Sequence, residues 1–123
     1  MLNGLPILIV EDEPIIALGL AFEVERFGGV PVGPVPTVLQ AIEMLQSKAV
    51  GAAMLDANLL DRDVTPVAVA LIRQSIPFVI HSAIGMPDEL KQLHPDIPVI
   101  PKPAAAEAVS MRCSNNLPHE WPH

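Results

Sequence analysis

Several short apolar stretches of this 123-residue chain are followed by polar side chains that could do chemistry together. Glu11 and Asp12 close the first such run, Asp56 closes another, and Ser82 and Lys102 follow two later ones. Three carboxylates brought together repel one another unless a cation intervenes, and a hard divalent cation such as Mg²⁺ takes carboxylate, water and phosphate oxygens as ligands. An ammonium and a hydroxyl can contact an anionic oxygen. The set therefore suits phosphoryl transfer to a carboxylate nucleophile.

The apolar runs before these residues are typical of buried strands. Continuous aliphatic and β-branched runs without helical spacing predict strands covered on both faces, as in a parallel sheet. One further run is interrupted by prolines, which cannot donate to a ladder, and it therefore predicts an edge strand. The predicted strands span residues 6–10, 30–35 (the edge strand), 51–55, 77–81 and 97–100.

Segments with helical spacing alternate with these strands. The first begins at a proline, which suits an opening turn after an acidic cap, and ends at two glycines. Ile15, Leu18, Phe22 and the segment from Val24 to Phe27 form a roughly helical apolar stripe along it. Thr37 and Thr65 are the expected N-caps of the next two helices. The predicted helices span residues 14–27, 37–45, 65–74, 88–93 and 104–112.

Strands that alternate with helices predict an α/β fold, here a flavodoxin-like, doubly wound, five-stranded parallel sheet with helices on both faces. Right-handed crossovers and a strand order of 2-1-3-4-5 put the functional crevice beyond the carboxyl ends of the strands, between the first and third. The residues with chemistry should then meet at one edge of the sheet. The length suits a single domain, and residues 113–123 match no regular element and are expected to form a tail.

Composition excludes several classes of function. The net charge is −7, and only seven basic residues are present. Such a chain repels a phosphate backbone, so direct DNA or RNA binding is not expected. No apolar run reaches the length of a membrane span, and the first residues lack the pattern of a secretory signal. With a single cysteine as well, a cytoplasmic protein is expected.

Four motifs resemble those of one known family, the receiver domains of two-component response regulators. They are Ile-Leu-Ile-Val-Glu-Asp-Glu-Pro at 7–14, Met-Leu-Asp-Ala-Asn-Leu at 54–59, His-Ser-Ala at 81–83 and Pro-Lys-Pro at 101–103. Each motif is weak alone, but four in this order and spacing are specific. The match runs from about Pro6 to Arg112, so residues 1–112 are expected to form one receiver domain.

The resemblance assigns roles around a metal ion. Asp56 would be the phospho-accepting nucleophile and a ligand of Mg²⁺. Asp12 would bind the ion directly, and Glu11 would act largely through a bound water. Asn58 would contribute its backbone carbonyl to the same ion.

Later motifs imply the phosphoryl contacts and show where this chain departs from the family. Ser82 and Lys102 would contact the phosphoryl oxygens, and the family often has a cis peptide before the proline that is here Pro103. Most members carry Tyr or Phe three residues before the lysine, where Val99 stands, so their aromatic readout of phosphorylation is not expected. The segment 78–85 loosely resembles the signature of the stand-alone receivers called FAT GUY regulators.

The expected partners are a histidine kinase or histidine phosphotransfer protein and an unknown downstream protein reached by protein–protein contact. The helix at 104–112 carries enough small apolar residues to form an interface, such as that of a homodimer. Beyond self-phosphorylation and slow autodephosphorylation, enzymatic turnover is not expected. One alternative is a small Mg²⁺-dependent aspartyl phosphatase, although that class needs a carboxylate where this chain has Asn58. Another is a degenerate receiver-like module that never accepts phosphate.

Other polar residues near the site have ordinary structural explanations. Asp61 and Asp63 are expected in a solvated loop or near the cap of the third helix, and His81 is expected to be a satisfied residue beside the site. A lone acid or lysine is often no more than a cap, a turn residue or a surface charge. Only the joint occurrence of acids, hydroxyl and ammonium at successive strand ends favours function.

Overall fold

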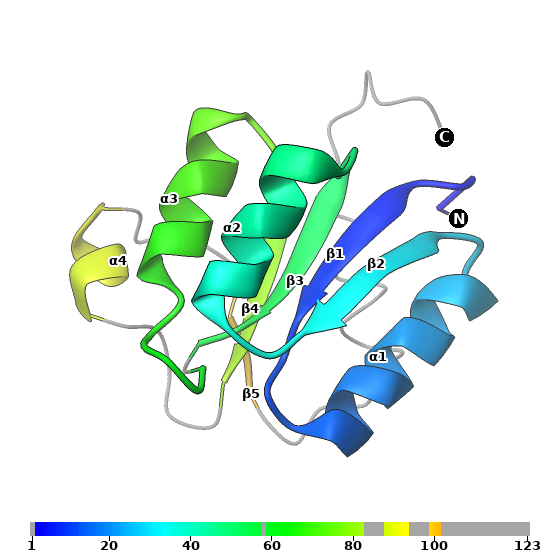
Figure 1. Cartoon of the computed structure of the whole chain (residues 1–123), viewed down its shortest axis with the longest axis horizontal. Helices are drawn as coiled ribbons and strands as arrows, with labels where there is room; N and C mark the ends of the chain where they lie inside the picture. The colour runs from blue at the N-terminus through cyan, green and yellow to red at the C-terminus, as the bar shows by residue number, and fades with distance from the viewer. Residues whose placement is uncertain (1, 58, 83–87, 94–98, 102–123) are drawn as a thin grey trace.

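A computed structural model describes residues 2–57, 59–82, 88–93 and 99–101 of the chain (Figure 1). Its centre is a five-stranded sheet in the order β2-β1-β3-β4-β5, with every neighbouring pair parallel. This is the strand order predicted from the sequence. The strands are β1 (Pro6–Val10), β2 (Val30–Val35), β3 (Ala52–Asp56), β4 (Phe78–Ser82) and β5 (Val99–Pro101).

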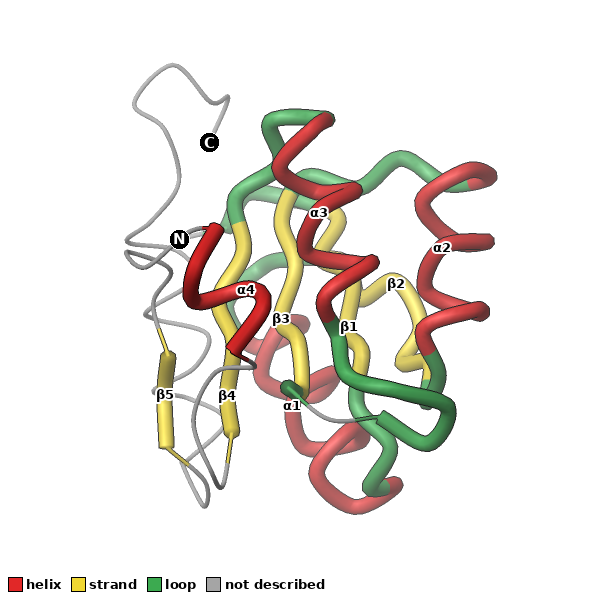
Figure 2. The backbone as a smooth tube through the Cα atoms, turned by 90° about the vertical axis from the view of Figure 1, so that its left-hand side faces the viewer, coloured by secondary structure: helices red, strands yellow, loops and turns green. Residues whose placement is uncertain are grey.

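Helices cover both faces of this sheet, as predicted. They are α1 (Pro14–Arg26), α2 (Val38–Ser47), α3 (Thr65–Arg73) and α4 (Asp88–Leu93). Helix α1 packs on one face, whereas α2 and α3 lie side by side on the other with α4 next to α3 (Figure 2). Within the described residues, no helix is long and apolar enough to span a membrane.

Alternation along β1 shows why the sheet needs two helical layers. Ile7 and Ile9 are buried in the cluster that contains residues of α1, and Leu8 and Val10 are buried in the cluster that contains residues of α2 and α3. Because successive side chains of a strand point to opposite faces, a wholly apolar strand is stable only when both faces are covered. The continuous apolar run in the sequence therefore predicted the layering.

The inward face of α1 agrees only in part with the apolar stripe predicted from the sequence: Val24 is buried as predicted, but three other members of the stripe are exposed. Ile15, Leu18 and Phe22 remain 88%, 70% and 71% exposed. The residues of α1 that are buried against the sheet are Ala17, Leu20, Ala21 and Val24. Two apolar stripes interleave on this helix, and the way the chain leaves β1 decides which of them meets the sheet. The helix itself begins at Pro14 as predicted and is followed by Gly28, whose φ of 87° suits glycine.

Capping agrees with prediction at α2 and differs by one residue at α3. The Thr37 hydroxyl accepts a hydrogen bond from the Gln40 amide at 3.1 Å, as expected of an N-cap. Thr65 is the first residue of α3, not its cap, and its amide donates to the Asp63 carboxylate at 2.9 Å. The predicted helix at 104–112 and the predicted cis peptide before Pro103 lie outside the described residues.

Candidate functional site

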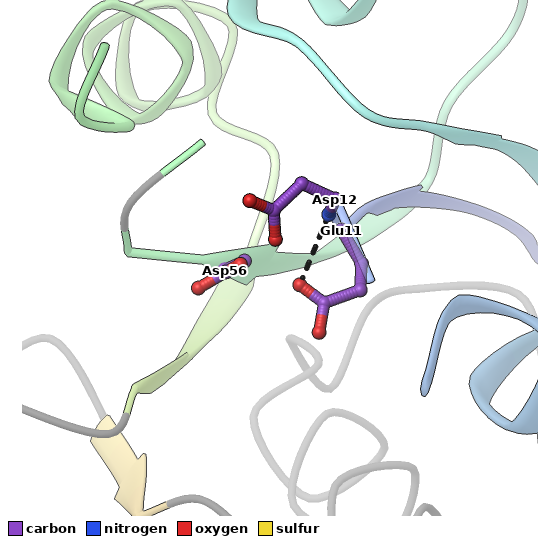
Figure 3. Close-up of side chains that lie close together, drawn as sticks. All are labelled: Glu11, Asp12 and Asp56. Atoms are coloured by element: carbon purple, nitrogen blue, oxygen red, sulfur yellow. Dashed lines mark hydrogen bonds between the residues drawn. The ribbon is translucent and has the colours of Figure 1, made fainter. Parts of the chain in front are cut away.

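Three carboxylates meet at the carboxyl edge of the sheet. Strands β1 and β3 are neighbours in parallel register, with Val10 opposite Leu55, so the residues that end them lie together. Glu11 and Asp12 follow β1 directly, and Asp56 is the last residue of β3. Figure 3 shows the three side chains gathered at this point. This convergence is the one predicted from the positions of acids at strand ends.

The carboxylate cluster formed by Glu11, Asp12 and Asp56 is tight and largely shielded from water. One oxygen from each side chain lies within 4.8 Å of the other two. Glu11 is 2% exposed and Asp56 5% exposed, whereas Asp12 is half-buried. The Glu11 carboxylate accepts a hydrogen bond from the Asp12 amide at 3.2 Å (Figure 3). Two buried acids and one solvent-reaching acid therefore share a small volume.

This arrangement has a clear electrostatic consequence. Like charges at such separations repel strongly where water is partly excluded. A divalent cation relieves that repulsion, and small hard cations bind carboxylate oxygens in preference to nitrogen or sulfur. The donor set is all oxygen, and its oxygens are close enough to share one ion. The cluster therefore fits Mg²⁺ as a ligand set.

Backbone hydrogen bonds hold the segments that carry the cluster. The Glu11 amide donates to the carbonyl of Val35 at 3.0 Å, which ties the end of β1 to the end of β2. On the other side, the Ala57 amide donates to the carbonyl of His81 at 3.3 Å, and the Val64 amide donates to the carbonyl of Ala57 at 2.9 Å. The residue that follows Asp56 is thus anchored to β4 and to the residue just before α3.

His81 occupies a position next to the nucleophile candidate. It pairs in register with Asp56 across the β3–β4 ladder, and its side chain is buried. The sequence predicted a satisfied residue beside the site: the position beside Asp56 is confirmed, whereas the hydrogen bonding of the side chain stays a prediction.

Two loop aspartates hold neighbouring helices. Asp63 stays within its own loop, where it accepts from the Thr65 amide and pairs with Arg62 at 3.7 Å. Burial by itself raises the pKa of the Asp63 carboxyl, but its contacts with Thr65 and Arg62 outweigh that effect, so the pKa is lowered. The sequence correctly placed this residue near the cap of the third helix.

Asp61 does something that the sequence did not predict. Its carboxylate accepts hydrogen bonds from the amides of Val38 and Leu39, at 2.9 and 3.2 Å, in the first turn of α2. These bonds, the one from Val38 above all, lower the pKa of the Asp61 carboxyl. Asp61 lies 23 positions after Val38 and 22 after Leu39. A contact over such a separation leaves no local pattern in a sequence, so no signal pointed to it.

A cavity of about 270 Å³ opens beside the carboxylate cluster. Glu11 and Asp12 line one part of it, and apolar residues such as Leu18, Pro34 and Pro36 line the rest. The cavity therefore joins the acidic edge of the sheet to the exposed stripe of α1.

The remaining predicted site residues are only partly located. Ser82 ends β4 and pairs in register with Pro101 of β5, so it lies at the same edge of the sheet as the carboxylate cluster. Asn58 and Lys102 lie outside the described residues. The structure thus brings together three of the predicted metal ligands and places the backbone of Ser82 near them.

Comparison with known proteins adds an independent line of evidence. No protein-family model and no curated protein matches the chain. Solved structures do match: the solution structure of SdrG from Sphingomonas melonis Fr1 has a TM-score of 0.78 and 35% identity, over 94% of this chain and 98% of that one. The BeF3-activated conformation of SdrG, from Pseudomonas melonis Fr1, has a TM-score of 0.70 and 39% identity, over 89% and 92%.

Receiver proteins from other bacteria have the same architecture. A response regulator receiver protein from Sinorhizobium medicae WSM419 has a TM-score of 0.76 and 26% identity, over 94% of this chain and 95% of that one. The PhyR response regulator REC domain of Erythrobacter litoralis has a TM-score of 0.81 over 99% and 97%, and at 24% identity it bears on the fold alone. With the acidic edge described above, these likenesses show that the chain belongs to the receiver domains of two-component response regulators.

Proposed function

We propose that this chain is a receiver that accepts a phosphoryl group on Asp56 in a Mg²⁺-dependent reaction. The observation that carries the proposal is the position of Asp56, 5% exposed and within 4.8 Å of two further carboxylates. A divalent cation bound among these three carboxylates would offset their mutual repulsion. The domain would comprise residues 1–112, with 113–123 as a tail.

The proposed chemistry is an in-line displacement at phosphorus. An oxygen of the Asp56 carboxylate forms the new bond to phosphorus as the phosphorus–nitrogen bond of a donor phosphohistidine breaks. The electron pair of that bond stays on the imidazole nitrogen. Ser82 and Lys102 would contact the phosphoryl oxygens, as the resemblance implies.

The acids next to Asp56 have a different task from the nucleophile. Asp12 would bind Mg²⁺ directly, Glu11 would act largely through a water, and Asn58 would offer its backbone carbonyl. Mg²⁺, when bound, would offset the negative charge that otherwise keeps a phosphoryl group away from three carboxylates. The chain's contribution is to keep these oxygens together at the sheet edge.

The proposed phosphoryl donor is a histidine kinase or a histidine phosphotransfer protein in the cytoplasm. Output would pass by protein–protein contact to a downstream partner, in keeping with a net charge of −7 that disfavours nucleic acid. Membership in the FAT GUY group and a homodimer through the 104–112 helix stay predictions.

The proposal is tested by activation with a phosphoryl mimic. A similar receiver, SdrG, has been solved in a BeF3-activated conformation, so the same reagent is a fitting probe. Beryllofluoride with Mg²⁺ should shift the amide resonances of wild type around Asp56 and Ser82, and Asp56→Asn should abolish these shifts. Unshifted resonances in wild type, or equal shifts in the variant, would refute the proposal.

Two further assays separate the alternatives. Multiple turnovers on phosphomonoesters would indicate the aspartyl phosphatase, whereas the receiver should give none. A Mg²⁺ titration followed by NMR should perturb the amides of Glu11 and Asp12, and an inert site would indicate a degenerate interaction module.

A further inference from the structure

A hydrogen-bonded tie joins the connection after β3 to a helix that is distant in sequence. Asp61 lies between β3 and α3, and its two carboxylate oxygens accept from the amides of Val38 and Leu39 at 2.9 and 3.2 Å. The first amides of a helix have no partner within that helix, so a carboxylate placed there is well held. Asp61 is therefore anchored to α2 even though its side chain is exposed to solvent.

This tie is more than a cap for α2, because α2 already has one. The Thr37 hydroxyl accepts from the Gln40 amide at 3.1 Å, which is the usual N-cap interaction. Asp61 takes the two preceding amides and reaches them from a different part of the chain. Its distinctive effect is to fix the distance between the β3–α3 connection and the start of α2.

The same start of α2 is tied to the other half of the carboxylate cluster. Val35 ends β2 just before α2, and its carbonyl accepts from the Glu11 amide at 3.0 Å. The path therefore closes: from Glu11 through Val35 to the first turn of α2 and through Asp61 into the β3–α3 connection. From there the hydrogen bond of the Val64 amide to the carbonyl of Ala57 leads back to Asp56. We call this closed path the α2 brace. It links the two chain segments that carry the cluster outside the β1–β3 ladder itself.

We propose that Asp61 is a positioning residue which, through the α2 brace, holds the carboxylate cluster ready for a cation. The inference rests on the proposed function, since it concerns the cation affinity of that site. Three carboxylates within 4.8 Å of one another repel, so the chain segments that carry them must be held in place for a cation to find its ligands already assembled. A brace that resists this separation lowers the reorganisation that binding requires, and preorganised ligands bind more tightly.

The neighbouring Asp63 provides a matched control. It lies in the same connection and also accepts a backbone amide, that of Thr65 at 2.9 Å. That bond and its ion pair with Arg62 stay within residues 62–65, so Asp63 is no part of the brace. Removing either aspartate deletes one negative charge and one helix-capping carboxylate. Only the loss of Asp61 opens the closed path.

The experiment measures Mg²⁺ affinity by NMR titration of the full chain, with thermal stability recorded in parallel. Asp61→Ala should weaken Mg²⁺ binding by about threefold to tenfold, less than the ten- to hundredfold typical of removing a direct partner of a metal ligand. Asp61→Asn keeps one acceptor oxygen and should restore part of the affinity. Asp63→Ala should bind Mg²⁺ as wild type does, even where it melts at a lower temperature.

Each result decides a different point. If wild type itself does not bind Mg²⁺, the proposed function fails. If wild type binds and Asp61→Ala and Asp61→Asn both retain its affinity, the brace plays no part and the inference is overturned. Equal weakening by Asp61→Ala and Asp63→Ala also overturns it, because a general loosening of the loop would then be enough. If Asp61→Ala does not fold, the Mg²⁺ affinities of Asp61→Asn and Asp63→Ala are compared instead. Weaker binding by Asp61→Asn alone supports the inference, and equal affinities overturn it.

Discussion

Replacing Asp56 by asparagine should make the metal-free protein more stable. The change removes one of three negative charges whose oxygens lie within 4.8 Å of one another, and it keeps the size and shape of a side chain that is almost fully buried. Asparagine can still accept and donate hydrogen bonds at the same position. The proposed nucleophile is thus expected to destabilise the metal-free protein relative to the asparagine variant.

The size of the effect follows from the separation. Two unit charges 4.8 Å apart repel by ~3.5 kcal/mol at an effective dielectric constant of about 20, and by ~0.9 kcal/mol in bulk water. The pair with buried Glu11 lies nearer the first value, and the pair with half-buried Asp12 lies between the two. Interactions with neighbouring groups relieve part of this repulsion. We expect a net gain of ~1–3 kcal/mol, which for a domain of this size raises Tm by about 3–10 °C.

The assay is thermal unfolding in EDTA and again with Mg²⁺. Wild type should gain stability with Mg²⁺, by about 2.7 kcal/mol at a hundred times Kd, whereas Asp56→Asn should gain much less. The difference in Tm between Asp56→Asn and wild type should therefore become smaller or change sign when Mg²⁺ is added. Glu43→Gln, on the exposed side of α2, removes one charge away from the cluster and serves as the control.

Two outcomes would refute this reasoning. If Asp56→Asn melts at or below wild type in EDTA, the carboxylates do not repel one another as their separation requires. If Glu43→Gln raises Tm by as much, the gain reflects the net charge of −7 and not the cluster.

Other substitutions test the packing and the electrostatics. Leu55→Ala, at a fully buried position of β3, should cost about 2–5 kcal/mol in urea unfolding, and a loss below 1 kcal/mol would contradict the described core. Gly29→Ala should cost about 1–3 kcal/mol because the new methyl group would lie 2.9 Å from a side chain of α1, and an unchanged Tm would contradict that close approach. Phe22→Ser, on the exposed stripe, should change unfolding free energy by no more than about 0.5 kcal/mol, and a loss of 2 kcal/mol or more would mean that the stripe is packed. Hydrogen bonds from the amides of Val38 and Leu39 lower the pKa of the Asp61 carboxyl. The stability that this carboxylate adds is therefore complete above its unfolded-state pKa of about 3.9, and it is lost as the pH falls through the lower folded-state pKa. The difference in Tm between wild type and Asp61→Asn should therefore shrink from about pH 7 to about pH 3, and a constant difference would contradict the hydrogen bonds to α2.

Much of the fold was accessible from the sequence because its signals are local. Continuous apolar runs predicted buried parallel strands, and helical spacing between them predicted the crossovers. The handedness of such crossovers leaves few strand orders, and the observed order is the predicted one. Acids directly after β1 and at the end of β3 then had to meet, since parallel strands place their carboxyl ends at one edge.

Other features depended on packing between distant segments. The sequence of α1 offers two apolar stripes, and only its docking on the sheet decided that Leu20 turns inward with Val24 while Leu18 and Phe22, predicted in the same stripe as Val24, stay exposed. The prediction for Thr65 missed by one residue, because the side chain of Asp63 competes for the same capping role.

The carboxylate cluster shows most clearly where the two kinds of information divide. The presence of acids at neighbouring strand ends was determined by the sequence, through hydrophobic periodicity and the alternation of strands and helices. Their mutual separation, the burial of Asp56 and the bond from Asp61 to α2 were decided only by tertiary structure. The physical reason is that periodicity reports the environment of a residue along its own element, whereas a contact across more than twenty residues depends on how whole elements pack.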